Sequence, residues 1–343
     1  MARVGLVVNP AAGRDIRRLT GGASVVDDYA KRRVADCVLE GLTAVPDPPS
    51  VRVMPDRSGI ADHVLEEAPD AIEAEALDIP LERSAADTRR AAAQFRADGA
   101  DAVVVLGGDG TTRDVAGEIG SVPVVSVSTG TNNVVPSAVD GTVAGVAAAL
   151  VATSTVSAAD VVERHGRIEA RAETPSGEKR LAALAAAEVS SRSFIGSRAL
   201  LDPDDLVGGV VSRARPGDIG LPAVAGALES VAPGEPGGVA LRLTDPVDAP
   251  RTARAVLAPG VVATVGIESC KRVEPDEPVA FEVPDGVVGA DGERELELTD
   301  TTVEFRVRSD GPRLVDVDAA LAAGADAGTF ALEAVDVPPS PED

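Results

Sequence analysis

The sequence predicts an α/β protein with a parallel-sheet domain over residues 1–150 and a mainly antiparallel β domain over residues 151–310. The chain has 343 residues, which is enough for about two domains. Apolar runs alternate with amphipathic stretches in the first part, as in βαβ units, and shorter alternating runs separated by turn residues follow. Residues 311–343 are expected to form a C-terminal return segment and an acidic tail.

Four apolar runs are the expected strands of the first domain. The run at 103–106 reads Val-Val-Val-Leu without a polar break, which is typical of a strand buried on both faces. Such strands occur in parallel sheets that helices cover on both sides. The expected strands are 4–8, 51–54, 103–106 and 122–127.

Amphipathic patterns between these strands predict the helices. The clearest helix start is Ser84, because Asp87 follows three residues later and the two side chains can form a capping box. The expected helices are 28–42, 59–67, 84–98, 114–119 and 143–152.

The second domain is predicted from short β-like runs and from turn residues. Glycine at 177 and the Asp-Gly pairs at 291–292 and 310–311 are typical of hairpin turns. Helical patterns are limited to 219–231 inside this domain and 316–325 after it. The expected strands are 182–190, 239–243, 261–267, 279–283 and 295–298.

Charge and composition exclude several classes of protein. Asp and Glu number 56 against 32 Lys and Arg, and the net charge of -24 repels nucleic-acid phosphates and anionic lipid. We therefore expect no nucleic-acid partner and no membrane partner. Two cysteines and two histidines without ligand spacing argue against zinc and against a disulfide framework. No apolar run suits a signal peptide or a spanning helix, so we expect a cytoplasmic protein.

The basic residues are almost all arginine, since Lys31, Lys179 and Lys271 are the only lysines. An acid excess with scarce lysine suggests a salt-loving host, because concentrated salt quenches the self-repulsion of an acidic chain. An ordinary acidic protein is the alternative.

The sequence Gly107-Gly108-Asp109-Gly110-Thr111-Thr112-Arg113 follows a buried strand directly and leads into a helical pattern. Glycines let the backbone turn tightly and approach a phosphate, and free N–H groups at the helix start point toward the anion. A carboxylate there repels phosphate unless it holds a metal or takes a proton. Asp109 is therefore the candidate catalytic residue, and a turn with a capping aspartate is the structural alternative.

Two further loops follow predicted strands of the same sheet. In open α/β sheets ligands bind beyond the carboxyl ends of neighbouring strands, so all three loops should border one crevice. Hydroxyl and amide groups suit the edges of an adenine, a ribose or a carboxamide. Each loop taken alone could be a simple connection. The candidate binding residues are Asn9 and Gly13 in the first loop, and Thr129, Gly130, Thr131, Asn132 and Asn133 in the other.

The strand-borne GGDGT at 107–111 resembles the hallmark of the superfamily that joins NAD kinases, diacylglycerol and sphingosine kinases and phosphofructokinases. Within it, the chain resembles the ATP-NAD kinase family, in the prokaryotic branch that includes acetoin-catabolism protein X. The similar segments cover most of the chain: VVNPAAG at 7–13, GGDGTTRDVA at 107–116, GTNNV at 130–134, IGLPAVAG at 219–226 and GVVGADGERELEL at 286–298.

The resemblance implies a Rossmann-like domain followed by an all-β, sandwich-like domain, and phosphoryl transfer from ATP or polyphosphate to the 2′-hydroxyl of NAD. It implies that Asp109 takes the hydroxyl proton and that Gly107, Gly108, Gly110 and Thr111 cradle phosphate. Mg²⁺ would accompany the substrate phosphates and not be fixed by the protein alone. Family members are typically homo-oligomers, so a homo-oligomer is expected. A lipid-type kinase and a non-catalytic nucleotide-binding protein of the same fold are the alternatives.

Three residues remain as weaker candidates. The family's Asn-acid motif is matched by Ala187-Glu188, where the acid is kept and the amide is missing. Glu188 could equally be a solvent-facing strand residue. Asp291 resembles a late Asp-Gly element that approaches the site, or it simply forms a hairpin turn. Arg113 could neutralise a phosphate or lie on a helix surface.

Overall fold

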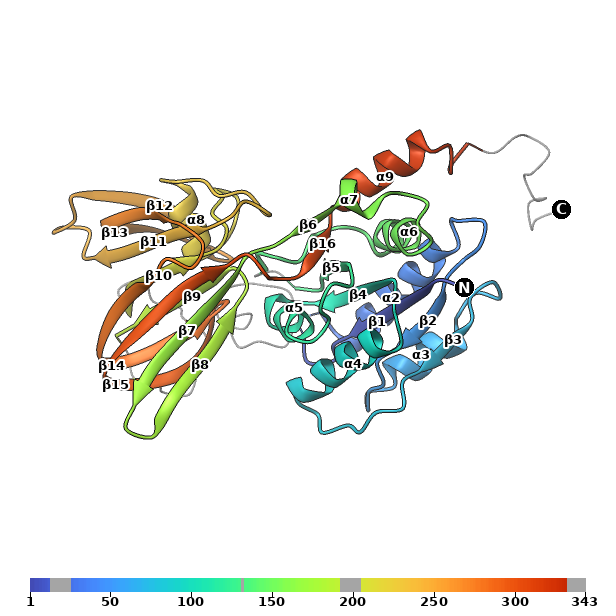
Figure 1. Ribbon diagram of the computed structural model, residues 1–343, viewed down its shortest axis with the longest axis horizontal. Helices are drawn as coiled ribbons and strands as arrows, with labels where there is room; N and C mark the ends of the chain where they lie inside the picture. The colour runs from blue at the N-terminus through green and yellow to red at the C-terminus, as the bar shows by residue number, and fades with distance from the viewer. Residues whose placement is uncertain (13–25, 131–132, 192–204, 332–343) are drawn as a thin grey trace.

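The computed structural model describes residues 1–12, 26–130, 133–191 and 205–331, which form two lobes (Figure 1). Gly13, Thr131, Asn132 and the tail at 332–343 lie outside the described residues. No helix in the described ranges is long and apolar enough to cross a membrane.

The first lobe is built on a seven-stranded sheet in the order β3-β2-β1-β4-β5-β16-β6. All pairs are parallel except β16 with β6. The chain moves from β1 to β2 on one side and later to β4 on the other side of β1, so the strand order reverses between β1 and β4. The strands are β1 (Arg3–Val8), β2 (Ser50–Val53), β3 (Ala74–Ala76), β4 (Ala102–Gly107), β5 (Val124–Ser128), β6 (Val162–Arg164) and β16 (Arg313–Val315).

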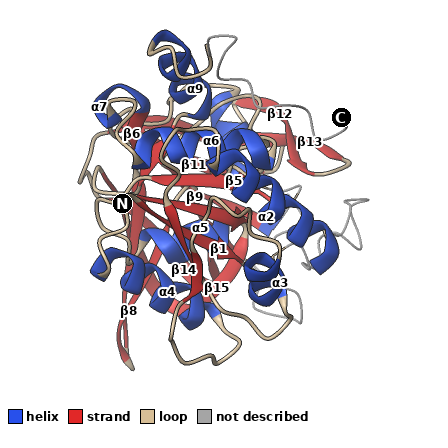
Figure 2. Cartoon of the chain, turned by 90° about the vertical axis from the view of Figure 1, so that its right-hand side faces the viewer, coloured by secondary structure: helices blue, strands red, loops and turns tan. Residues whose placement is uncertain are grey.

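Helices cover both faces of this sheet (Figure 2). One face carries α2 (Asp28–Leu42), α3 (Ile60–Glu66), α6 (Gly141–Ala152), α7 (Ala158–Val161) and α9 (Val317–Asp326). The other carries α4 (Ala85–Ala97) and α5 (Asp109–Ala116). The capping box predicted at Ser84 and Asp87 is present.

The helix expected at 114–119 is wrong in its start, because α5 begins five residues earlier, at Asp109. Gly108 is the N-cap, with extended backbone angles, and the glycine-rich sequence therefore supplies the first turn of the helix and not a long loop. This places Asp109 at the positive end of the helix dipole.

The second lobe is a nine-stranded antiparallel sheet in the order β12-β13-β11-β10-β9-β14-β15-β7-β8, which confirms the mainly antiparallel β domain. Two apolar cores lie against it, one of them shared with α8 (Leu221–Gly226). Its strands are β7 (Arg167–Thr174), β8 (Gly177–Ala183), β9 (Ala186–Ser190), β10 (Leu206–Val211), β11 (Gly238–Thr244), β12 (Arg251–Ala258), β13 (Val261–Val273), β14 (Val279–Ala290) and β15 (Glu293–Arg308).

The helix expected at 219–231 is much shorter, since α8 ends at Gly226. A Cβ on Gly226 would lie 2.2 Å from the carbonyl carbon of Arg215, so this glycine allows a close backbone crossing. The chain then returns to form a bridge between Val231 and Ala214, which ends the helical path.

The two lobes are joined by two adjacent chain crossings, at 165–166 and 309–312. The His165 N–H donates to the Pro312 carbonyl at 2.9 Å, and the Arg164 guanidinium donates to the Gly311 carbonyl at 2.9 Å. The Asp-Gly pair at 310–311 is therefore not a hairpin turn, because it leads from β15 in one sheet to β16 in the other. The sheet of the first lobe therefore contains strands that precede the β domain in the sequence and one, β16, that follows it.

Candidate active site

The carboxyl ends of β1 and β4 meet where the strand order reverses, which is the usual ligand crevice of such a sheet. Asn9, directly after β1, donates from Nδ2 to the Thr111 hydroxyl at 2.8 Å. The Asn9 N–H also donates to the Leu106 carbonyl at 3.2 Å. The first loop and the glycine-rich segment therefore share one site.

Two of the glycines of this segment, Gly107 and Gly108, have close neighbours. A Cβ on Gly107 would lie 2.6 Å from the Thr111 Cβ, and a Cβ on Gly108 would lie 2.8 Å from the Asn133 amide oxygen. Thr112 is fully buried, and its hydroxyl contacts the Gly108 carbonyl at 3.1 Å and the Ser126 hydroxyl at 2.7 Å. Buried hydrogen bonds of Thr112 therefore fix the turn between β4 and α5.

The loop after β5 lies against the same turn. The Thr129 N–H donates to the Gly107 carbonyl at 3.0 Å, and the Ser128 hydroxyl accepts from the Asn133 amide at 2.6 Å and donates to the Gly130 carbonyl at 2.8 Å. The Thr129 hydroxyl is buried and has no hydrogen-bond partner among the described residues.

Asp109 is 5% exposed, and its carboxylate accepts three backbone hydrogen bonds. The Val134 N–H lies 2.8 Å from Oδ2 and 3.1 Å from Oδ1, and the Val135 N–H lies 2.8 Å from Oδ1. Burial and the nearby negative charge of Asp291 raise the pKa of Asp109 to about 7, although the two amides and the Arg213 cation oppose the shift. The group can therefore exchange a proton near neutral pH.

The turn between β14 and β15, together with the start of β15, brings three acidic side chains toward α5. Asp291 is 9% exposed and has a left-handed φ of 53°, and its carboxylate accepts the N–H groups of 184–186. The carboxylate oxygens of Glu293 would lie 3.9 and 4.0 Å from a Cβ on Gly110. Glu295 accepts from Arg113 at 2.8 Å. The β domain thus contacts the helix that begins at Asp109.

Arg113 is engaged by these protein groups. Its guanidinium donates to the Ala290 carbonyl at 3.1 Å and lies 3.6 Å from Asp291, in addition to the bond with Glu295. Burial works against the Arg113 cation, but the charges of Asp291 and Glu295 outweigh it and raise its pKa. Arg113 joins the two domains here, and in this state it is not free to neutralise a phosphate.

Glu188 lies on β9 and is buried, at 3% exposure, so the solvent-facing alternative is wrong. Its Oε1 accepts the Gly292 N–H at 2.9 Å. Ala187 beside it is also buried and packs in the core of the β domain.

Three buried residues with ionisable side chains were given no role from the sequence. Arg213 is buried and pairs with Asp218 at 2.8 Å, and its charge acts on both Asp109 and His165. His165 is buried at the domain crossing, where burial lowers its pKa to about 4 and keeps it neutral. Lys31 is fully buried on α2 and donates to the Pro10 carbonyl at 2.6 Å. Its rarity among the basic residues is the one signal that could have drawn attention to it.

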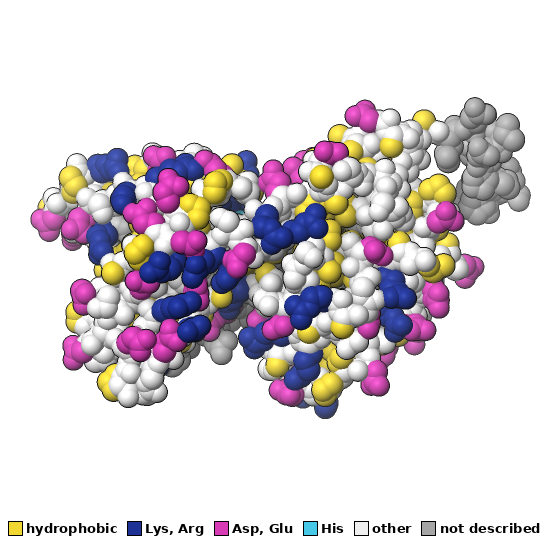
Figure 3. All heavy atoms as spheres, in the orientation of Figure 1, with side chains coloured by type: hydrophobic (Ala, Val, Ile, Leu, Met, Phe, Trp, Pro, Cys, Tyr) yellow, Lys and Arg dark blue, Asp and Glu magenta, His cyan; other side chains and the backbone are white. Residues whose placement is uncertain are grey.

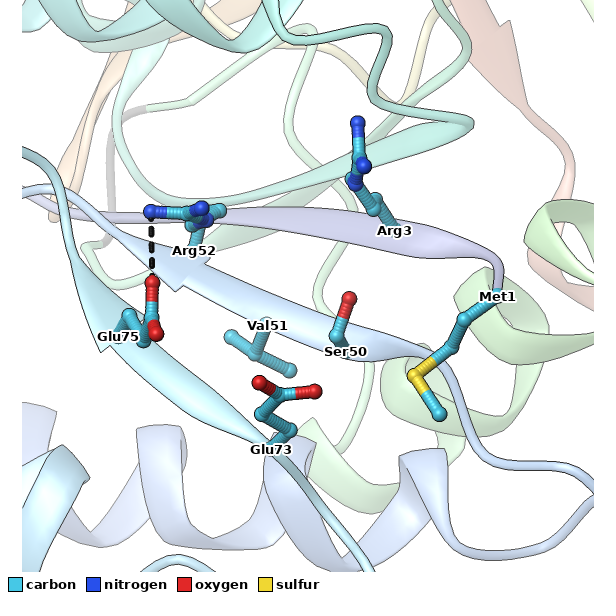
Figure 4. Close-up of a pocket in the computed structure, with 7 residues that line it drawn as sticks. All are labelled: Met1, Arg3, Ser50, Val51, Arg52, Glu73 and Glu75. Atoms are coloured by element: carbon cyan, nitrogen blue, oxygen red, sulfur yellow. Dashed lines mark ion pairs between the residues drawn. The ribbon is translucent and has the colours of Figure 1, made fainter.

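A pocket of about 200 Å³ lies elsewhere, at the amino ends of β1 and β2 (Figure 4). Its charged side chains are Arg3, Arg52, Glu73 and Glu75, and Arg52 pairs with Glu75 at 2.9 Å. These side chains are exposed or half-buried and of mixed sign, and the pocket is at the opposite end of the strands from Asp109. It is not part of the candidate site.

Comparisons with known proteins match both domains of the chain. Residues 4–154 match the family model of the ATP-NAD kinase N-terminal domain, and residues 166–310 match that of the acetoin catabolism protein X C-terminal domain. Acetoin catabolism protein X of Cupriavidus necator is 35% identical over 331 residues, which cover 93% of this chain and 91% of the relative. A crystal structure of yeast NADH kinase complexed with NADH aligns over 97% of this chain and 89% of its own, with a TM-score of 0.49 and 13% identity.

Proposed function

The chain belongs to the ATP-NAD kinase family, in the branch of acetoin catabolism protein X, and from this membership and the state of Asp109 we propose that it is a nucleotide kinase. The proposed reaction transfers a phosphoryl group from ATP or polyphosphate to the 2′-hydroxyl of NAD or an NAD-like nucleotide. The observation that carries the proposal is a buried carboxylate, with a pKa of about 7, at the carboxyl end of β4.

Asp109 is the proposed general base. In the transfer, the ribose 2′-oxygen forms a bond to the terminal phosphorus, the bond from that phosphorus to the leaving nucleotide or polyphosphate oxygen breaks, and the hydroxyl proton passes to the Asp109 carboxylate. A base works best when its pKa lies near the working pH, which the burial of Asp109 provides. Positioning of the two substrates supplies most of the remaining catalysis.

Mg²⁺ is proposed to arrive on the donor phosphates. Mg²⁺ usually keeps several waters and is held by substrate phosphates with few protein carboxylates. Asp109 and Asp291 each present their oxygens to backbone amides, and in the described ranges no group of three or more His, Cys, Asp or Glu could hold a metal ion. When bound, the ion would neutralise charge on the phosphates, and the steps assigned to Asp109 do not depend on a protein-held metal.

One alternative has support of its own, namely nucleotide binding without turnover. Both Asp109 oxygens already accept amide hydrogen bonds, and Ala187 presents a methyl group where the family motif has an asparagine amide. Both features are compatible with a protein that binds the nucleotide but does not transfer the phosphoryl group.

The deciding experiment is NADP formation from NAD, with ATP or polyphosphate as donor, in the presence of Mg²⁺ and KCl. Asp109→Asn should reduce product formation by at least about 100-fold, because the amide cannot accept the proton. Asp62→Asn, which changes an exposed carboxylate on α3, is the matched control and should leave the rate unchanged. Stabilisation of the wild type by NAD in a thermal-shift assay without any NADP would favour the non-catalytic alternative.

A further inference from the structure

Two buried aspartates from different domains are held in the same way. The Asp109 carboxylate accepts the consecutive amides of Val134 and Val135, at 2.8 Å for each shortest contact. The Asp291 carboxylate accepts the consecutive amides of 184–186, at 3.1, 2.7 and 3.2 Å to its Oδ1. Each carboxylate therefore fixes the backbone of a short segment.

The two segments pack against each other where the domains meet. Val135, Leu184 and Ala185 form one buried apolar cluster, and Val134 packs against its edge. The amides that hold Asp109 thus rest on the residues that Asp291 holds.

Arg113 closes this arrangement into a ring. It lies one helical turn after Asp109 on α5, and its guanidinium is 3.6 Å from the Asp291 carboxylate and 3.1 Å from the Ala290 carbonyl. The ring runs from Asp109 through α5 to Arg113, then to Asp291, to 184–186, to 134–135, and back to Asp109. Its members come from distant parts of the sequence and from both domains.

We propose that Asp291 is a positioning residue for Asp109, one that fixes the surface on which 134–135 rest and acts on Asp109 through its negative charge. The catalytic meaning of this role rests on the proposed function, but the ring is a property of the protein without substrate. Asp291 thereby makes the proton exchange of Asp109 depend on the β domain.

The effect of the Asp291 charge on the protonation of Asp109 can be measured separately from the effects of the other charged groups nearby. Among the described residues, the charged groups on the surrounding elements are Arg113 and Asp114 on α5 itself, Asp291 after β14, Glu293 and Glu295 on β15, Glu188 on β9 and Arg213 after β10. Segment 133–135 has none. Burial is the largest cause of the raised pKa of Asp109, the charge of Asp291 is the next, and Arg213 opposes both.

The test uses thermal unfolding of the full chain as a function of pH at one KCl concentration, without substrate. Asp109 is protonated more readily in the folded protein than in the unfolded chain. Its contribution to the free energy of unfolding is therefore complete below the ordinary Asp pKa and declines as pH rises. The decline ends at the pKa of Asp109 in the folded protein, about 7, and we call this pH the levelling point. Asp291→Asn should move this levelling point to lower pH, because a repelling charge is removed. Arg113→Gln should move it to higher pH, because the cation that neutralises Asp291 is removed.

Opposite shifts distinguish this proposal from simple loosening of the interface, which would hydrate Asp109 and lower the levelling point in both variants. Each shift should vanish when Asp109→Asn is added, since the titration of Asp109 is then absent. Glu293→Gln is the matched control at the same turn and should shift the point less than Asp291→Asn. Shifts of the same sign, no shift, or shifts that persist without Asp109 would overturn the proposal. If Asp291→Asn does not fold, the sign of the Arg113→Gln shift still decides. Absence of NADP formation bears only on the proposed function.

Discussion

At the scale of single residues, the protonation of Asp109 governs what the site can do. Burial alone would keep this carboxyl neutral, and the Asp291 charge strengthens that tendency, while two amides and Arg213 favour the anion. The balance places the pKa at about 7, so a small change in any of these groups changes the fraction of usable base.

This balance predicts the pH dependence of the proposed reaction. We expect kcat/KM to rise with pH with a midpoint at about 7, since Asp109 must lose its proton before it can accept another. Below the midpoint the rate should fall by about tenfold per pH unit. Initial rates of NADP formation across the range would measure it. A midpoint near 4, the ordinary value for Asp, would show that the titrating base is solvated.

The residues of the site could be predicted only in part from the sequence. The position of Asp109 at a strand end follows from local signals, namely an unbroken apolar run and glycines. Its partners do not, because the amides it binds lie 25 and 26 residues further on, and Arg113 meets Glu295 across 182 residues. The contacts of Asp109 arise only when the first domain folds, and the contact of Arg113 with Glu295 arises only when the two domains come together.

At the scale of elements, the contact between α2 and α6 depends on glycines that face backbone. A Cβ on Gly41 would lie 2.1 Å from the Thr142 carbonyl oxygen, one on Gly141 would lie 2.6 Å from that of Val34, and one on Gly145 would lie 2.2 Å from that of Val38. The two helices therefore approach closely, and α6 buries nearly all of its surface between α2, α9 and the sheet.

Gly145→Ala should consequently destabilise the protein although alanine is the better helix former. The gain in helix propensity is about 1 kcal/mol, whereas overpacking costs about 1–3 kcal/mol and here meets backbone that cannot move aside. We expect a net loss in the free energy of unfolding, measured by denaturant titration. Gly117→Ala is the control, since its Cβ would meet nothing closer than 3.7 Å and its backbone is already helical. Equal stability of the two variants would contradict this account.

Elements with strong local signals were predictable, and those set by tertiary contact were not. Helix α2 runs over 28–42 as expected, and the Ser84 capping box marks the start of α4. β3 was missed because its three residues, Ala-Glu-Ala, are exposed or half-buried at the sheet edge and show no apolar run. β16 was missed because its place beside β5 is decided by the return of the chain from the other domain.

At the scale of the whole molecule, the charge of -24 opposes compactness. Positive and negative side chains are mixed over both lobes on the face drawn in Figure 3. Many charged side chains of the described residues are paired at the surface, as in Arg52 with Glu75 at 2.9 Å. Exposed pairs of this kind are worth at most about 1 kcal/mol each. They do not remove the excess of acid, so the net repulsion is expected to dominate the response to salt.

We therefore predict that KCl raises the thermal unfolding midpoint. At 1 M salt the screening length falls to about 3 Å, which suppresses repulsion between distant carboxylates more than attraction within pairs already in contact. Unfolding in a KCl series, with sucrose at matched osmolarity as the uncharged control, separates screening from exclusion of cosolute from the protein surface. A salt-loving protein should gain stability in KCl well beyond the gain in sucrose. Full stability in dilute buffer, unchanged by KCl, would show that the paired arginines already compensate for the acidic surface and that the composition reflects no adaptation to salt.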